Sequence, residues 1–278
     1  MNFVTRFAPS PTGYLHRGHA FSAWSAFSAA KAEGGVCLLR IEDTDHTRCR
    51  PDFEAAILED LAWLGIRWPE PVRRQSAHMA DYAAALDRLI ARGLVYRCFR
   101  TRKELAIDIA NAPHGATDVV RGAPLPPAQE RALMEAGKPF AWRLHLDACR
   151  AALGTAWRDL AFKSDGVTVR AEPDRLGDAI VARKEFPTSY HIASVHDDAL
   201  QGVTHVIRGE DLREAAHLHV LLQALFAWPT PRYRHHGLIL NEDGVRLAKR
   251  DAAESLRSLR AAGHSPDDVL RSVGFAHR

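Results

Sequence analysis

The chain contains 278 residues, 46% of them hydrophobic and 26% charged, with a formal net charge of +3 at pH 7. This composition is typical of a globular protein with two or three lobes, and its mildly basic balance permits nucleic-acid binding without requiring it. It excludes a membrane-spanning chain, because no stretch approaches the roughly 18 apolar residues that a membrane span needs. The start MNFVTRFAP does not resemble an export signal, and the four cysteines form no C-x-x-C pair, so we expect a cytoplasmic protein without a disulfide framework.

The first hundred residues alternate between strand and helix patterns. Pro51 stands at a favoured first helical position, and Gly65 and Gly93 end the second and third expected helices. An apolar run that closes in acidic residues is typical of a central parallel strand. The expected strands cover residues 2–8 and 36–43, and the expected helices cover 17–32, 51–65 and 78–92. This order predicts an α/β fold with a doubly wound parallel sheet of the Rossmann type.

The pattern loosens between residues 95 and 174, where a loop rich in proline and glycine covers 111–127. Regular order then returns with expected strands at 178–183, 204–209 and 233–240, a helix at 211–227 and a helical segment at the C-terminus. We therefore predict three parts. They are a split Rossmann-type domain (1–95 and 175–240), an inserted smaller α+β subdomain (96–174) and a short C-terminal segment (241–278).

Two histidines stand where the first helix is expected to begin, within RFAPSPTGYLHRGHAFSA (6–23). A helix N-terminus attracts phosphate, and Gly18 leaves room for a ligand to approach the backbone. His16 and His19 share one face of the first turn and can donate hydrogen bonds to phosphoryl oxygens as charge develops. A single histidine more often has a core or surface role, but a pair flanking a glycine at a strand–helix junction favours phosphate chemistry.

A lysine near the other end of the chain is a second candidate. Lys249 follows the tight turn NEDG (241–244) in a short basic segment, from which a flexible ammonium can reach phosphates. Without further context, a solvated charge after a hairpin is the commoner interpretation.

Four stretches, in the expected order, resemble the glutamyl group of class I aminoacyl-tRNA synthetases. RFAPSPTGYLHRGHA (6–20) resembles their HIGH signature, and RLAKR (246–250) resembles a lysine–arginine form of their KMSKS element. LLRIEDTD (38–45) and GVTHVIRGEDL (202–212) also match the glutamyl pattern. The similarity covers nearly the whole chain, and it implies the class I synthetase fold with an inserted subdomain of the acceptor type.

The resemblance implies adenylation of glutamate, in which the amino-acid carboxylate attacks the α-phosphate of ATP, supplied with Mg²⁺, and expels pyrophosphate. It assigns His16, His19 and Lys249 to catalysis, and these three with Gly18 to ATP binding. The residues that it assigns to L-glutamate are Arg6, Phe7, Ala8, Pro9, Ser10, Glu42, Tyr190 and Arg208.

The chemistry of these residue types agrees with the assignment. Glu42 can pair with the α-ammonium group, and an arginine, Arg6 or Arg208, can bind a carboxylate through two hydrogen bonds. That arrangement disfavours glutamine, because its amide would present donors to donors. The alternative is that Glu42 and Arg208 form a structural ion pair with each other.

Several positions depart from the family pattern. Arg17 replaces an aliphatic residue, His191 stands where glutamyl enzymes commonly carry asparagine, and Ala248 replaces a serine. Relatives often hold zinc through a C-x-C pair in the insertion, but here Arg100 occupies the second position and Cys98 stands alone, so we predict no zinc.

An apparent calcium loop between residues 43 and 54 is also rejected. Asp43, Asp45, Thr47 and Glu54 imitate its spacing, but Arg48 stands where such a loop needs glycine, and a proline interrupts it. We predict no metal ligand in this protein.

Only 29 residues follow Lys249, whereas full glutamyl-tRNA synthetases continue into a large anticodon-binding region. The chain therefore resembles the shortened glutamyl-queuosine tRNA(Asp) synthetases, which activate glutamate without tRNA and transfer it to queuosine in the anticodon loop of tRNA(Asp). Two alternatives stay open: a truncated synthetase that charges tRNA 3′ ends, and a catalytically idle tRNA-binding relative. We expect a monomer without membrane contact.

Overall fold

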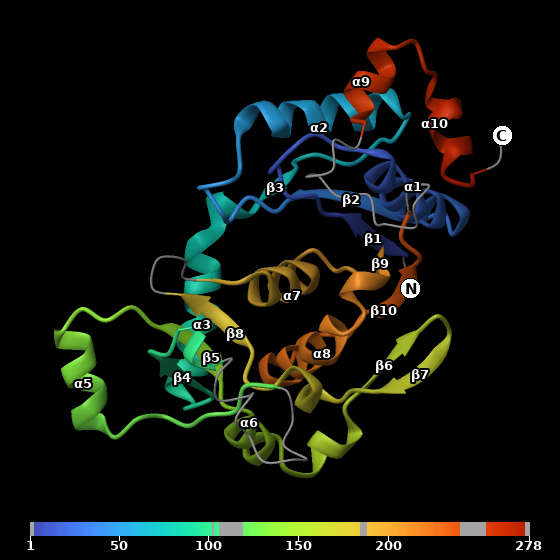
Figure 1. Cartoon of the computed structure of the whole chain (residues 1–278). Helices are drawn as coiled ribbons and strands as arrows, with labels where there is room; N and C mark the ends of the chain where they lie inside the picture. Colours follow the sequence, from blue (N-terminus) through green and yellow to red (C-terminus); the bar gives the residue numbers. More distant parts are fainter. Residues whose placement is uncertain (1–2, 102, 106–118, 184–187, 240–253, 276–278) are drawn as a thin grey trace.

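The computed structural model of the chain describes residues 3–101, 103–105, 119–183, 188–239 and 254–275. It confirms the predicted α/β class and the doubly wound parallel sheet (Figure 1). One parallel sheet has the order β3–β2–β1, and a second has the parallel order β9–β10–β6, to which residues Val167–Arg170 add an antiparallel edge strand. The strands are β1 (Val4–Phe7), β2 (Val36–Ile41), β3 (Arg73–Arg74), β6 (Ala161–Ser164), β9 (His205–Gly209) and β10 (Arg232–His236).

The two sheets adjoin at β1 and β9, where the strand order reverses. The Thr204 amide donates to the Val4 carbonyl at 2.9 Å, and the Thr204 hydroxyl accepts from the Val4 amide at 2.9 Å. In open α/β sheets, ligands bind in the crevice outside the carboxyl ends of the strands at such a reversal. The fold therefore places its natural binding crevice just after Phe7 and Gly209.

Helices cover both faces of this sheet, and β2 shows why. Leu39 and Ile41 of β2 pack into one core with α1 (Arg17–Ala32), α2 (Pro51–Trp63), α9 (Leu256–Ala261) and α10 (Pro266–Ser272). Leu38, which points to the opposite face, packs against a second core formed largely by α3 (Met79–Ala91), α7 (Tyr190–Leu200) and α8 (Ala215–Phe226). A strand that is apolar on both faces is the pattern expected of a central parallel strand.

The first three helices agree with the sequence prediction. Helix α1 buries Ala20, Ala23, Ala26 and Ala30, which recur every three or four residues along one face. Helix α2 begins at Pro51 with two acidic residues in its first turn, and a 3₁₀ turn (Gln75–His78) precedes α3. The helix expected at 211–227 begins later, at Ala215, because residues Glu210–Leu212 form a separate 3₁₀ turn.

The insertion is built on a separate antiparallel sheet with the order β4–β5–β8, formed by β4 (Val95–Cys98), β5 (Ala141–Leu144) and β8 (Ile180–Arg183). Strand β8 was expected in the parallel sheet, so that prediction was wrong. Strand β6, expected within the insertion, pairs instead with β10, and it forms a hairpin with β7 (Val167–Arg170). The structure further describes α5 (Pro127–Glu135), α6 (Leu146–Leu153) and the 3₁₀ turns Gly154–Asp159 and Pro173–Leu176.

The C-terminal helical segment was predicted correctly, as α9 and α10. Both helices lie beside α2 and α1 in Figure 1, on the far side of the molecule from α5 and β4. The Leu256 amide donates to the Leu15 carbonyl at 2.8 Å, and Ser255 forms an antiparallel bridge with His16. The segment that follows residue 253 is therefore tied to the beginning of α1.

Candidate active site

A cavity of about 480 Å³ occupies the crevice after β1, β9 and β10. Every sequence-predicted site residue within the described part of the chain lines it, and Lys249 lies outside the described residues. The residues brought together are Arg6, Phe7, Ala8, Pro9, Ser10, His16, Gly18, His19, Glu42, Tyr190 and Arg208.

The two histidines form the N-terminal cap of α1. The Nδ1 atom of His16 accepts from the Gly18 amide at 3.1 Å, and the Nδ1 atom of His19 accepts from the His16 amide at 3.2 Å. Because Nδ1 accepts in both rings, each neutral imidazole carries its proton on Nε2. Both rings line the cavity, with their centroids 3.9 Å apart.

A contact within the protein explains why glycine stands at position 18, without any need for a ligand to approach the backbone. A Cβ atom at this position would lie 3.0 Å from Cε1 and 3.2 Å from Nδ1 of the His16 ring. The absence of a side chain thus lets the His16 imidazole fold over the helix start and accept its hydrogen bond.

Arg208, at the end of β9, is a buried guanidinium without a carboxylate within 4 Å among the residues that the structure describes. Its partners are neutral: the Tyr190 hydroxyl at 3.2 Å, the Leu212 carbonyl at 2.9 Å, and ring nitrogens of His219 and His235, each at 3.4 Å. An uncompensated buried cation is costly, so this arrangement favours an anionic ligand.

The imidazoles around Arg208 are held neutral. Burial, reinforced by the charge of Arg208, lowers the pKa of His191 to about 4 and that of His235 to about 4, and it depresses the pKa of His219 well below its usual value. The Nδ1 atom of His219 faces Arg208, and its Nε2 atom lies 3.2 Å from Nδ1 of His191. With His219 accepting from Arg208 and donating to His191, the three side chains form one hydrogen-bonded chain.

We expect the stability of the protein to fall as the pH drops from 6.5 toward 4. The unfolded chain binds protons on these histidines near pH 6.5, whereas the folded chain does so only near pH 4, so acidification favours unfolding. His191→Asn removes one such group, so the slope of unfolding free energy against pH should flatten by about 1 kcal/mol per pH unit. Urea unfolding of both proteins between pH 7 and 4.5 measures this, and equal slopes would contradict it.

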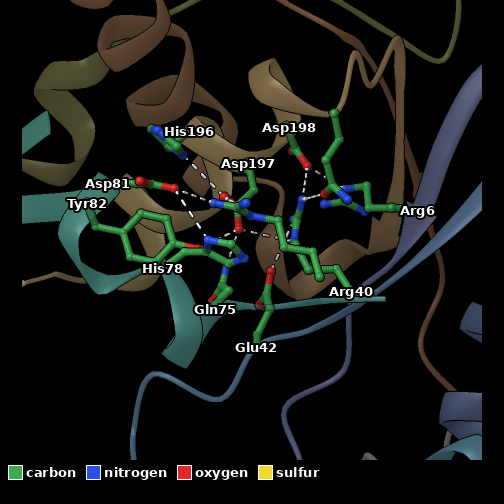
Figure 2. Close-up of polar contacts among 12 residues, drawn as sticks. Arg6, Arg40, Glu42, Gln75, His78, Asp81, Tyr82, His196, Asp197 and Asp198 are labelled. Carbon is green, nitrogen blue, oxygen red and sulfur yellow. Dashed lines mark hydrogen bonds and ion pairs between the residues drawn. The ribbon is translucent and has the colours of Figure 1, made fainter. Parts of the chain in front are cut away.

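Unlike Arg208, Arg6 and Glu42 are each paired with an oppositely charged side chain, as Figure 2 shows. The Nε atom of Arg6 donates to Asp198 at 3.1 Å, and Oε1 of Glu42 accepts from Arg40 at 3.2 Å. Glu42 is thus paired with Arg40 and not with Arg208, which removes the alternative of a structural Glu42–Arg208 pair. Burial raises the pKa of Glu42, an effect that the charges of Arg40 and Arg6 oppose.

Sequence reasoning missed several residues around this site. Arg40 lies within the motif LLRIEDTD, but no function was predicted for it. Helix α7, which carries Asp197 and Asp198, was not predicted at all. Two adjacent acids in the stretch IASVHDDAL were the available signal, because burial of both demands cationic partners. His219 gave no such signal.

A second cavity, of about 630 Å³, adjoins the first and shares Ser10, Thr12, Glu42 and Tyr190 with it. Its other walls include Arg143 of β5 and Ile180 of β8, so it extends toward the inserted sheet. His191 also lines it.

The acidic residues of the rejected calcium loop have protein partners. Asp43 accepts from the amide and hydroxyl of Ser76, Asp45 accepts from Thr47 and Arg48, and Glu54 accepts from Arg74. No group of three or more metal-binding side chains occurs among the residues whose placement is described. In the same part of the chain, no helix is long and apolar enough to cross a membrane.

Comparison with known proteins gives a consistent result. The family model described as "tRNA synthetases class I (E and Q), catalytic domain" matches residues 2–275. A Rhodobacter capsulatus protein named glutamyl-Q tRNA(Asp) synthetase is 46% identical, over 98% of this chain and 100% of that protein. A Symbiobacterium thermophilum protein of the same name is 38% identical, over 97% of this chain and 85% of that protein.

A solved structure resembles the fold. It is a glutamate tRNA ligase from Elizabethkingia meningosepticum in complex with its amino acid, with a TM-score of 0.75 and 27% sequence identity. The match covers 96% of this chain but only 59% of that ligase, so this chain spans little more than half of the longer enzyme.

Proposed function

The chain belongs to the class I tRNA synthetase family for glutamate and glutamine (E and Q), and from that premise we propose that it activates L-glutamate with ATP and transfers it to queuosine in tRNA(Asp). The glutamate α-carboxylate oxygen attacks the α-phosphorus of ATP, the bond to the β-phosphate bridge breaks, and pyrophosphate leaves. A queuosine hydroxyl then attacks the carbonyl carbon of glutamyl-adenylate, loses its proton and releases AMP. The enzyme is thus a ligase that forms a carbon–oxygen bond.

The observation that carries the amino-acid assignment is the uncompensated cation at Arg208. Its guanidinium lines the cavity, is buried, and contacts only neutral groups in the described structure. A side-chain carboxylate of the substrate supplies the missing negative charge, while Glu42, which lines the same cavity, suits the α-ammonium group. Arg6 is already paired with Asp198, so we assign the main carboxylate contact to Arg208 and a supporting one to Arg6.

The ATP assignment is supported by the N-terminus of α1. His16 and His19 line the cavity at the beginning of this helix, where the positive end of the helix dipole favours phosphoryl oxygens and an imidazole can donate a hydrogen bond to them. Lys249, outside the described residues, is proposed as the third phosphate-binding group on its motif alone. Mg²⁺ would accompany the ATP phosphates, as it usually does, with few protein ligands.

The acceptor assignment is supported by the relatives. Those named glutamyl-Q tRNA(Asp) synthetase match this chain over most of their length, whereas the glutamate tRNA ligase extends well beyond it. The second cavity opens beside Glu42 and Tyr190 toward β5 and β8, which suits entry of an extruded nucleotide from the inserted subdomain. We retain the division into a split catalytic domain, an insertion and a C-terminal segment as part of this proposal.

The decisive experiment has two steps. Glutamate-dependent ATP–pyrophosphate exchange without RNA should proceed, because both substrates bind groups already in place. Labelled glutamate should then become attached to tRNA(Asp) that contains queuosine, at least 100-fold faster than to the same tRNA without it. Glutamine in place of glutamate serves as the control for selectivity.

The possible failures point to different alternatives. Exchange without transfer to tRNA(Asp), but with charging of tRNA(Glu) 3′ ends, would indicate a shortened glutamyl-tRNA synthetase. No exchange under any condition, together with tRNA binding, would indicate a catalytically idle relative.

Two further expectations remain part of the proposal. The chain should work without zinc, since Cys98 is buried beside Tyr96 and Leu105 and its expected partner is Arg100. It should also act as a monomer in the cytoplasm.

A further inference from the structure

One buried carboxylate holds two arginines that serve different parts of the candidate site. Oδ1 of Asp198 accepts from Nε of Arg6 at 3.1 Å and from Nη1 of Arg40 at 2.8 Å (Figure 2). The side chains of Asp198, Arg6 and Arg40 are no more than 5% exposed. Of the three, only Arg6 lines the cavity, so Asp198 acts from outside it.

Asp198 contacts Arg6 directly. Because Asp198 binds its Nε edge, the guanidinium is fixed in direction, and its remaining nitrogens lie nearer the Ile207 carbonyl, 3.5 Å from Nη1, and the cavity. An arginine fixed in this way meets a carboxylate with little loss of side-chain entropy.

Asp198 is also connected to Glu42, through the side chain of Arg40. The same guanidinium binds Asp198 and the side-chain oxygen of Gln201, at 3.1 Å, through Nη1, and it binds Oε1 of Glu42 through Nη2. Glu42 is only 10% exposed, so the position and ionisation of its carboxylate depend on Arg40. Asp198 in turn determines where Arg40 lies.

We propose that Asp198 is a positioning residue for the amino-acid substrate, aligning the carboxylate-binding Arg6 directly and the ammonium-binding Glu42 through Arg40. This inference rests on the proposed function and deepens it by naming what sets selectivity for glutamate. Asp198 touches neither the substrate nor the cavity, and its effect should be confined to the amino acid, because no residue of the ATP-binding N-terminus of α1 is among its partners in the described structure.

Asp197 provides a matched control on the same helix. It is fully buried, but its oxygens accept from Arg73, Gln75 and Tyr82 at 2.8–3.0 Å, and it approaches Arg40 only to 3.9 Å. Asp197→Asn therefore removes an equally buried charge from the network without releasing Arg6.

The experiment compares Asp198→Asn, Asp197→Asn and the parent protein as full chains in glutamate-dependent ATP–pyrophosphate exchange. We expect Asp198→Asn to raise KM for glutamate by about 10- to 100-fold, to leave KM for ATP within about threefold, and to reduce the preference for glutamate over glutamine at least tenfold. Asp197→Asn should lower the melting temperature but change KM for glutamate by less than threefold.

A milder variant distinguishes a loss of positioning from a general loss of structure. Gln201→Leu removes only the second acceptor of Arg40, and it should raise KM for glutamate about threefold without changing KM for ATP. If the Asp198 variant does not fold, an unchanged KM for glutamate in Gln201→Leu would overturn the proposal. Equal effects of Asp197→Asn and Asp198→Asn, or equal changes in the two KM values, would also overturn it. Absence of exchange in the parent would instead contradict the proposed function.

Discussion

Replacement of Arg208 by glutamine is expected to lower glutamate-dependent ATP–pyrophosphate exchange by about 10²- to 10⁴-fold while leaving the free protein nearly as stable as the parent. Removing one partner of a buried ion pair costs roughly 3–5 kcal/mol, and here the partner left alone is the carboxylate of the substrate. The groups that contact Arg208 inside the protein are neutral, so none of them becomes an orphaned charge. The change in unfolding free energy without ligand should stay within about 1 kcal/mol.

Arg6→Gln supplies the contrast, because Arg6 is paired with a buried carboxylate in the free protein. This variant should lose both stability and glutamate affinity, since Asp198 keeps only one arginine. Exchange kinetics and urea unfolding without ligand measure both effects. A larger loss of stability in Arg208→Gln than in Arg6→Gln would contradict the view that the charge of Arg208 is balanced by a bound anion and not by the protein.

Arg40→Met is expected to cause the largest loss of folding stability, about 3–5 kcal/mol at pH 8. The Arg40 side chain is fully buried and lies within 4 Å of three carboxylates, those of Glu42, Asp197 and Asp198. Methionine fills similar space but leaves these charges with fewer cations. Arg271→Met, which removes an exposed pair with Asp268, is the control and should cost less than about 1 kcal/mol.

The pH dependence identifies the cause of that loss. Burial already raises the pKa of Glu42, and removal of Arg40 should raise it further. A group whose pKa is raised by folding binds protons more readily in the folded chain, so the penalty should be largest at pH 8 and shrink toward pH 5. Differences taken against the parent at each pH remove the shared contribution of the histidines. A penalty that grows on acidification would exclude repulsion among carboxylates as its origin.

Much of the fold was predictable because local signals agree with tertiary placement. The alanines of α1 recur on one face, Pro51 begins α2, and β2 is apolar apart from Arg40. Strand β8 was misplaced because a short apolar run looks the same in a parallel and an antiparallel sheet. Helix α7 was missed because YHIASVHDDAL mixes histidine and aspartate into its apolar face, and its polar residues are buried rather than exposed.

The candidate site was likewise predictable only in part. Motif resemblance named part of the cavity lining, because each of those residues lies in or beside a short motif that can be recognised locally. It did not identify what holds them, because Asp198 lies 192 residues from Arg6 and 158 from Arg40. Such pairings arise only from the packing of α7 against the sheet, and no local pattern encodes them.

The two roles of α7 limit how its length can vary. The helix begins at Tyr190, which contacts Arg208, and two turns later carries the anchoring pair Asp197 and Asp198. Inserting or deleting one residue between them would rotate one end against the other by about 100° and shift it by about 1.5 Å. The tyrosine or the anchor would then face the wrong way. Natural variation in chain length should therefore spare residues 190–198 and accumulate in surface connections.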